Sequence, residues 1–236
     1  MTRRSPPPAP HPDMAEQPFW ISFSDLMTAL MALFLVAMSV ALLAITSDIA
    51  KTEDQKAGRE EDIDAFMTAL SRAAADFPGV SVRGRVVDFG ERARFETNSH
   101  RLNPEQVKLL REMTPQILRL AREPLGRKWL KRVVVEGFAD ARGSYLYNLN
   151  LSLQRAERLL CILIAPEASA TLSAEDRLMV RDLFLVSGSS FNALKANPEA
   201  SRRLELRLEF LELGETRAAS HDLPLEEEPR CPLDGR

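Results

Sequence analysis

Hydrophobic and polar residues are distributed very unevenly along the chain, and the longest apolar stretch comes early. Residues 26–45 form a run of twenty in which only Thr28 and Ser39 are polar. A helix of this length, rising about 1.5 Å per residue, spans about 30 Å, which matches the hydrocarbon core of a bilayer. The apolar part of a cleaved signal peptide is shorter, roughly 7 to 15 residues. We therefore predict a membrane-spanning helix over residues 18–46 that is kept as an anchor.

The segments on either side of this helix are polar. Residues 1–17 contain five prolines and are expected to form a disordered tail. Residues 48–61 are dense in charge, after which apolar residues return at the spacing of one helix face until Pro78 and Gly79 end the element. The residues on this face are Ile63, Phe66, Met67, Leu70 and Ala74. We expect an amphipathic connector helix over residues 47–78.

The remaining pattern alternates between strands and helices. Helices are expected from Asn103-Pro104 to about residue 122, from about residue 145 to 164, and from residue 174 onward. Strands are expected at residues 80–89, 132–136, 183–187 and 204–211. This order predicts an α+β sandwich domain over residues 79–213, in which helices pack on one sheet. Residues 214–236 contain three consecutive glutamates and three prolines, and we expect a disordered tail.

Composition excludes several classes of function. The net charge of -3 and the pI of about 5.8 give no basic excess for direct nucleic-acid binding. The histidines and cysteines have no zinc-ligand spacing. No histidine is placed to activate Ser152, Ser187 or Cys161, so we predict that the chain is not an enzyme. Cys161 and Cys231 either pair as a disulfide or remain as a buried thiol and a free one.

Asp25 lies at the edge of the apolar run. A charged carboxylate within a bilayer costs at least about 2.5 to 3.5 kcal/mol on insertion scales, so it needs a partner, a water path or a bound proton. Ala29, Ala32 and Ser39 share its helix face and would let another helix come close. We predict ion translocation at Asp25. The alternative is a solvated carboxylate at headgroup level, favoured by the helix dipole.

Two motifs resemble known families. Residues 20–28, Trp-Ile-Ser-Phe-Ser-Asp-Leu-Met-Thr, are similar to the membrane helix of MotB-type stator subunits, where an aromatic entry precedes the ion-carrying aspartate. Residues 135–143 and 147–156 resemble the signature of OmpA-like peptidoglycan-binding domains, with residues 95–102 as its first loop and 201–205 as its closing motif. The combination, with its Pro-Phe-Trp-Ile entry, resembles the B subunits of Zorya anti-phage defence systems.

This resemblance implies a stator-like subunit of a proton-driven motor in the bacterial inner membrane. It implies a cytoplasmic N-terminus, a periplasmic domain held by peptidoglycan, and a homodimer within five MotA-like (ZorA-type) channel subunits. Ion flow would reach cytoplasmic defence effectors indirectly. No cofactor is implied; the transported ion is a proton, with sodium as the alternative. The rival interpretations are a flagellar stator subunit and a structural anchor without transport. The connector is either a plug or a plain spacer.

The resemblance also implies a wall-binding site. The side chain of diaminopimelate ends in an ammonium and a carboxylate, for which Asp140 and Arg155 supply the opposite charges. Asn148 can hydrogen bond nearby, Tyr147 and Leu151 form the floor, and Arg203 lies at the rim. Gly143 permits the tight turn between the strand and the next helix. Phe138-Ala139 stands where the family usually has His-Thr, so two polar contacts with the ligand are missing. The alternative is a purely structural ion pair between Asp140 and Arg155.

Overall fold

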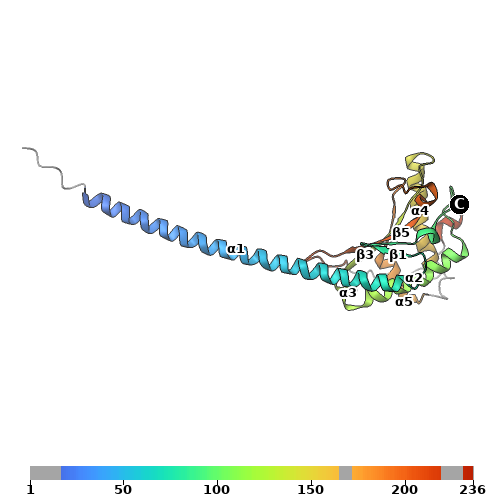
Figure 1. The fold of residues 1–236 in the computed structure, drawn as a ribbon, viewed down its shortest axis with the longest axis horizontal. Coiled ribbons are helices and arrows are strands. Elements are labelled where there is room, and N and C mark those ends of the chain that lie inside the picture. The colour runs from blue at the N-terminus through green and yellow to red at the C-terminus, as the bar shows by residue number, and fades with distance from the viewer. Residues whose placement is uncertain (1–16, 165–171, 219–230, 236) are drawn as a thin grey trace, which may run out of the picture. The chain divides into compact units, whose positions relative to one another are not determined.

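The computed structural model describes residues 17–164, 172–218 and 231–235, in two compact units, Met1–Gln55 and Lys56–Arg236 (Figure 1). The helices are α1 (Gln17–Ala74), η1 (Gly90–Ala93), α2 (Pro104–Arg122), α3 (Pro124–Trp129), α4 (Tyr145–Ile164), α5 (Ala174–Leu183), α6 (Pro198–Ser201) and η3 (Pro232–Gly235). The strands are β1 (Ser81–Arg83), β2 (Val86–Asp88), β3 (Leu130–Gly137), β4 (Phe184–Gly188) and β5 (Leu204–Phe210).

The first unit contains the apolar part of α1. Its large apolar side chains between Phe23 and Ile49 are exposed on every side of the helix, and none of its most apolar stretch is buried. The hydroxyls of Thr28 and Ser39 donate to carbonyl oxygens one turn earlier, both at 2.7 Å, so they are satisfied within the helix. A helix that is apolar all round and has satisfied polar groups suits a lipid environment, in agreement with the predicted membrane helix.

The second unit is an α+β domain built on one five-stranded sheet of order β1-β2-β5-β3-β4. β3 and β4 run parallel, and the other pairs are antiparallel. α4 packs against β3 and β4, and α2 packs against α3, α4 and α5. The core residues of β5 alternate with residues on the opposite face, as in a sheet covered by helices on one side. The predicted fold class is therefore confirmed.

The predicted helices agree closely with the structure. α2 begins at an Asn103 capping box with Gln106, and α4 has the predicted ends. The predicted single strand over residues 80–89 is wrong, because these residues form the β1–β2 hairpin. Gly84 lies in the turn with a φ of +56°, a conformation that glycine adopts without steric cost. This glycine in the middle of the predicted strand was the signal for the turn.

The last part of α1 belongs to the core of the second unit. The apolar face predicted for the connector is fully buried there, and the Phe66 ring packs edge-on against Phe210 with centroids 5.7 Å apart. Next to it, Asp62 accepts hydrogen bonds from Lys128 Nζ at 2.8 Å and from Trp129 Nε1 at 2.7 Å. The folded domain thus begins near Lys56, inside the segment predicted as connector.

Parts of the predicted C-terminal tail contact the domain. Cys231 forms a disulfide with Cys161 of α4, which decides between the two alternatives for the cysteines. Leu233 is buried, and Asp234 pairs with Arg158 at 2.7 Å. Glu215 pairs with Lys131. The expected disorder is therefore wrong for residues 214–218 and 231–235, because the disulfide, which the sequence left open, and the ion pairs hold these residues against the domain. The other tail residues, 1–16, 219–230 and 236, lie outside the described residues.

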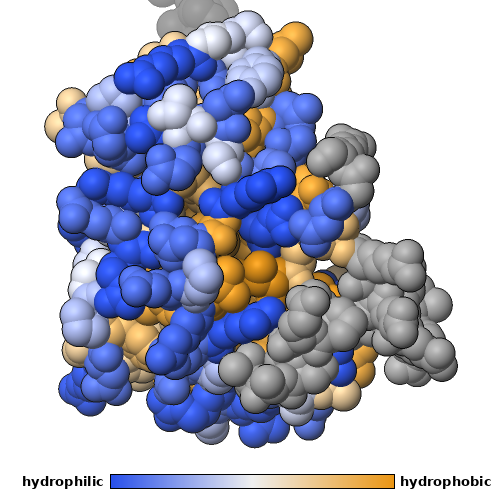
Figure 2. Space-filling model, turned by 90° about the vertical axis from the view of Figure 1, so that its right-hand side faces the viewer, coloured by the Kyte–Doolittle hydropathy of each residue, from blue (hydrophilic) through white to orange (hydrophobic). Residues whose placement is uncertain are grey.

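The surface of the second unit carries mixed charge. On the sheet face opposite the core, Arg132 pairs with Glu209 at 2.7 Å and Arg207 with Glu136 at 3.2 Å, across neighbouring strands. The face seen in Figure 2 is mostly hydrophilic, with an apolar area near its centre. Such a surface is typical of a domain exposed to water on most sides.

Candidate functional site

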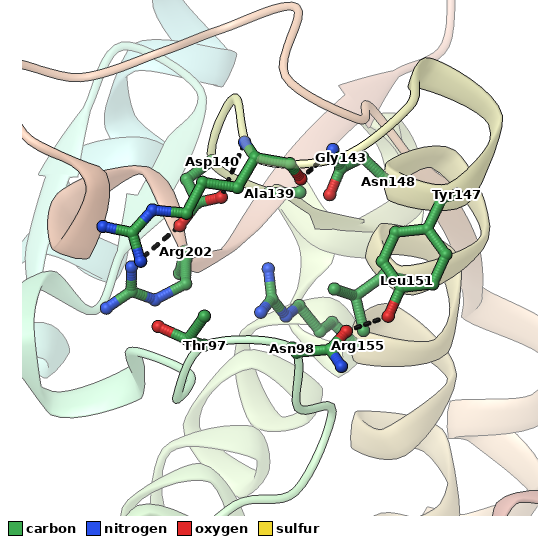
Figure 3. A pocket seen from close by; sticks show the side chains of 11 residues that line it. Thr97, Asn98, Ala139, Asp140, Gly143, Tyr147, Asn148, Leu151, Arg155 and Arg202 are labelled. Carbon is green, nitrogen blue, oxygen red and sulfur yellow. Dashed lines mark hydrogen bonds and ion pairs between the residues drawn. The ribbon is translucent and has the colours of Figure 1, made fainter.

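A cavity of about 280 Å³ lies where the loop after β3, the first half of α4 and the loop before α2 meet (Figure 3). It includes five of the six residues predicted to bind peptidoglycan. The lining residues are Thr97, Asn98, Ala139, Asp140, Arg142, Gly143, Tyr147, Asn148, Leu151, Arg155 and Arg202.

Two glycines bring the strand and the helix close enough to form this cavity. A Cβ on Gly137, the last residue of β3, would lie 2.0 Å from the carbonyl oxygen of Ser152 in α4, so only glycine permits this approach. Gly143 has a φ of +93° in the turn before α4, as expected from the sequence. On α4, Asn148, Leu151 and Arg155 follow at intervals of three and four residues and so share the helix face toward the cavity.

Arg155 is completely buried, with an exposed fraction of 0%. Its Nε donates to Ser99 O at 2.9 Å, Nη1 to Phe138 O at 2.6 Å and Nη2 to Glu96 O at 3.2 Å. Burial, together with the nearby charge of Arg202, lowers the pKa of Arg155 to about 10, so it stays protonated near neutral pH. In Figure 3 its guanidinium points into the middle of the cavity.

Asp140 forms an ion pair with Arg202, whose Nη1 donates to Oδ2 at 2.9 Å. The other oxygen, Oδ1, accepts from the backbone N–H of Arg142 at 3.1 Å. Burial alone would raise the pKa of Asp140, but the hydrogen bonds from Arg202 and Arg142 outweigh it and hold the pKa below its ordinary value of 3.8. Asp140 is therefore a carboxylate at neutral pH. Within the part of the chain that the structure describes, no ion pair joins it to Arg155, so the alternative of a structural Asp140–Arg155 pair is wrong.

The rim and floor are made by α4 and the loop before α2. The Tyr147 hydroxyl donates to the side chain of Asn98, which has a positive φ of 58°. Tyr147 is half exposed, whereas Leu151 is buried below it. Asn148 donates from Nδ2 to the Arg142 carbonyl at 2.7 Å and fixes the turn after β3. These contacts hold the two sides of the cavity together.

Arg203 is not among the residues that line the cavity, and its role at the rim of a wall-binding site stays a prediction. Its Nε pairs with Glu205 at 2.6 Å, and its guanidinium stacks 3.9 Å from the centre of the Phe138 ring. Side chains of successive residues near a strand point in opposite directions, so when Arg202 faces the cavity, Arg203 faces away from it. Sequence reasoning missed the roles of Arg202, Arg142 and Asn98. The adjacent arginines Arg202 and Arg203 indicated that one arginine lies near the site, but the sequence did not indicate which of the two faces the cavity.

The remaining predicted site residue, Asp25, lies on α1 in the first unit and is exposed. Its role in ion translocation stays a prediction. No cluster of three or more histidine, cysteine, aspartate or glutamate side chains suited to a metal occurs among residues 17–164, 172–218 and 231–235.

Comparison with known proteins gives similarities at both ends of the chain. Residues 2–45 match the family described as the membrane MotB of the proton-channel complex MotA/MotB. The cell wall anchor of the type VI secretion system from Pseudomonas aeruginosa is 24% identical, with 59% of this chain and 96% of that chain covered and a TM-score of 0.38. The periplasmic domain of MotB is 12% identical, with 55% and 66% covered and a TM-score of 0.37.

One relative extends over nearly the whole chain. The Zorya protein ZorB of Escherichia coli O139:H28 (strain E24377A / ETEC) is 43% identical over 210 residues, which cover 87% of this chain and 85% of the relative. Because this level of identity extends over most of both chains, the chain belongs to the ZorB family of Zorya proteins.

Proposed function

We propose that this chain is the stator-like subunit of a proton-driven motor in the bacterial inner membrane, anchored to peptidoglycan and coupling ion flow to anti-phage defence. The observation that carries the proposal is that a chain of the ZorB family joins an apolar helix bearing Asp25 to a domain with a buried, charged cavity at its wall-binding motif. The first part suits ion transfer in the membrane, and the second suits a fixed attachment.

Asp25 is the proposed ion carrier. The first unit offers no buried partner for it within the described residues, and a carboxylate beside an apolar helix is costly in lipid unless another chain surrounds it. We therefore propose a MotA-like channel subunit as its neighbour, with five copies around a dimer of this chain. Protonation and release at Asp25 would then drive rotation, with a proton as the proposed ion and sodium as the alternative.

The cavity is the proposed attachment to the wall. Its lining includes a buried guanidinium, a carboxylate and an apolar floor at Leu151, and diaminopimelate carries the matching charges on a methylene chain. Attachment places the domain in the periplasm and the N-terminus in the cytoplasm. A fixed domain gives the membrane part a support against which rotation can act.

Co-sedimentation of the full-length protein in detergent with purified sacculi tests the attachment. We expect Arg155→Ala and Tyr147→Ala to reduce the bound fraction, because they remove the cavity's buried charge and its rim. The control is Arg119→Ala on α2, an exposed arginine whose ion-pair partner is Glu123. Equal sedimentation of all these proteins would contradict a wall-binding role for the cavity.

Proton uptake by cells that carry the whole gene cluster tests the membrane part. Asp25→Asn keeps the side-chain size but cannot exchange a proton, whereas Asp25→Glu keeps the carboxyl group. We expect uptake to be lost in the first variant and retained at least in part in the second. Unchanged uptake in Asp25→Asn would support a structural anchor without transport.

A further inference from the structure

A disulfide holds a short C-terminal segment against α4. Cys231 is bonded to Cys161, and the residues that follow form η3, in which Leu233 is buried. We call residues 231–235 the C-terminal strap. Five residues with so little apolar surface to bury would not repay the entropy of ordering them by packing alone. The strap therefore depends on the disulfide to stay on the helix.

The strap lies on the part of α4 that leads to the cavity. Arg155, Arg158 and Cys161 follow one another at intervals of three residues, so each lies beside the next on the helix surface. The strap contacts the second and third of these positions. Asp234 accepts a hydrogen bond from Arg158 Nη1 at 2.7 Å, and Cys231 is bonded to Cys161. The strap thus ends about one turn from the arginine that points into the cavity.

The loop before α2, residues 96–101, meets α4 at the first of these positions. Two of its carbonyl oxygens accept hydrogen bonds from Arg155, at 2.9 and 3.2 Å. His100 of this loop is half-buried. Burial and the charge of Arg158 lower the pKa of His100, whereas the charge of Asp234 raises it. The loop is therefore close enough to the ion pair of the strap to respond to both of its charges.

The strap supplies negative charge to a group of basic side chains. The guanidiniums whose charges act on His100 are Arg158, Arg101 and Arg155. Among residues 17–164, 172–218 and 231–235, Asp234 is the only carboxylate that forms an ion pair with Arg158, whose side chain is mostly buried. Without Asp234, the charge of Arg158 would repel the basic residues of the loop. The strap therefore favours the loop position in which its carbonyl oxygens reach Arg155.

We propose that the C-terminal strap holds the loop before α2 against Arg155 only while Cys161 and Cys231 are joined, so that wall binding depends on the oxidation of this cysteine pair. The inference rests on the proposed wall attachment and adds a condition to it. Oxidation joins the two sulfur atoms and passes two electrons and two protons to a disulfide-bearing oxidant, which leaves as two thiols. Because disulfides form and persist outside the cytoplasm, the domain would reach its wall-binding form only after export.

Hydrogen–deuterium exchange of the full-length protein in detergent tests the strap without any ligand. The readout is the exchange rate of the Ser99 and Arg101 amides, which donate to Glu96 O and Ser99 Oγ within the loop. The chain has two cysteines and both are in this bond, so dithiothreitol acts on this bond alone. We expect reduction to speed the exchange of these amides at least about fivefold. Unchanged exchange would overturn the proposal.

Two variants separate the strap from a general loss of stability. Phe66→Ala weakens the core at α1 but keeps the disulfide, so we expect the loop amides to exchange as in the parent. Asp234→Asn also keeps the disulfide but removes the charge of the strap, and we expect exchange to be at least about twofold faster. Its matched control is Asp182→Asn, an exposed acid of α5 that pairs with Arg181. An equal rise in Phe66→Ala and in the reduced parent, or no rise in Asp234→Asn, would contradict the proposal.

Co-sedimentation with purified sacculi tests the consequence for wall binding. At limiting sacculi, we expect the bound fraction of the parent to fall at least about threefold on reduction and to recover on reoxidation. The double variant Cys161→Ser/Cys231→Ser should bind weakly with or without reductant. Equal binding by the oxidised and reduced parent would overturn this inference and leave the wall attachment intact. Binding by neither form would contradict the wall attachment itself, and the dependence of wall binding on the strap would fail with it.

Discussion

The position of Phe66 predicts that the end of α1 is a structural part of the second unit. Phe66 is 3% exposed and packs against the Phe210 ring of β5. Replacing a buried phenylalanine by alanine removes its transfer free energy and leaves a cavity, at a combined cost of about 3 to 5 kcal/mol. For a domain of this size, each kcal/mol corresponds to roughly 2 to 4 °C, so we expect Phe66→Ala to lower the Tm by roughly 6 to 20 °C.

Urea unfolding of the full-length protein, followed by tryptophan fluorescence, measures the loss in the free energy of unfolding. The chain has two tryptophans. Trp129 reports on the domain because its indole N–H donates a hydrogen bond to Asp62, which lies one turn before Phe66 on α1. The matched control is Thr68→Ala, an exposed position on α1 where the expected change is within about 0.5 kcal/mol. If Phe66→Ala unfolds at the same urea concentration as Thr68→Ala, residues 56–74 are not part of the core.

Three further predictions concern stability. Gly137→Ala places a Cβ 2.0 Å from the Ser152 carbonyl oxygen, and we expect a loss of about 3 kcal/mol in the same urea assay; a neutral effect would refute the close approach of β3 and α4. Cys231→Ser removes a link across 70 residues and is expected to cost up to about 4 kcal/mol; reductant should destabilise the parent and leave this variant unchanged. The pKa of Asp176 is lowered by hydrogen bonds from Arg122 and Ser173, despite the opposing effect of burial. Its stabilisation is therefore present above the unfolded pKa of about 3.8 and lost as pH falls below it, and Asp176→Asn should flatten the fall in Tm between about pH 4 and 2.

The regular elements could be predicted because local signals and the global fold agree. The capping box at Asn103 and the helical spacing of apolar residues around Phe66 each indicate one structure. The hairpin at Gly84 was missed because its two short strands read as one alternating segment. Contacts of the C-terminal segment depend on groups far apart in sequence, such as Arg158 and Asp234, which no local pattern indicates.

The candidate site was predictable in its members but not in its pairing. The motif brought Asp140 and Arg155 to one cavity, as expected from a turn between a strand and the next helix. It did not show that Asp140 would pair with Arg202, because that contact depends on which side of the chain faces the cavity just before β5. Arg203 was chosen from the same pair of residues, but its guanidinium pairs with Glu205 and does not line the cavity.

Phage plating efficiency on cells that carry the whole gene cluster tests whether ion flow at Asp25 and wall attachment through the cavity are both needed for defence. The comparison is between the parent, Asp25→Asn, Arg155→Ala and the control Arg119→Ala, at matched protein levels in the membrane. We expect protection in the parent and the control, and loss of protection in both other variants, because ion flow and wall attachment must act together. Protection that survives either change, or a parent that gives none, would contradict the proposed function.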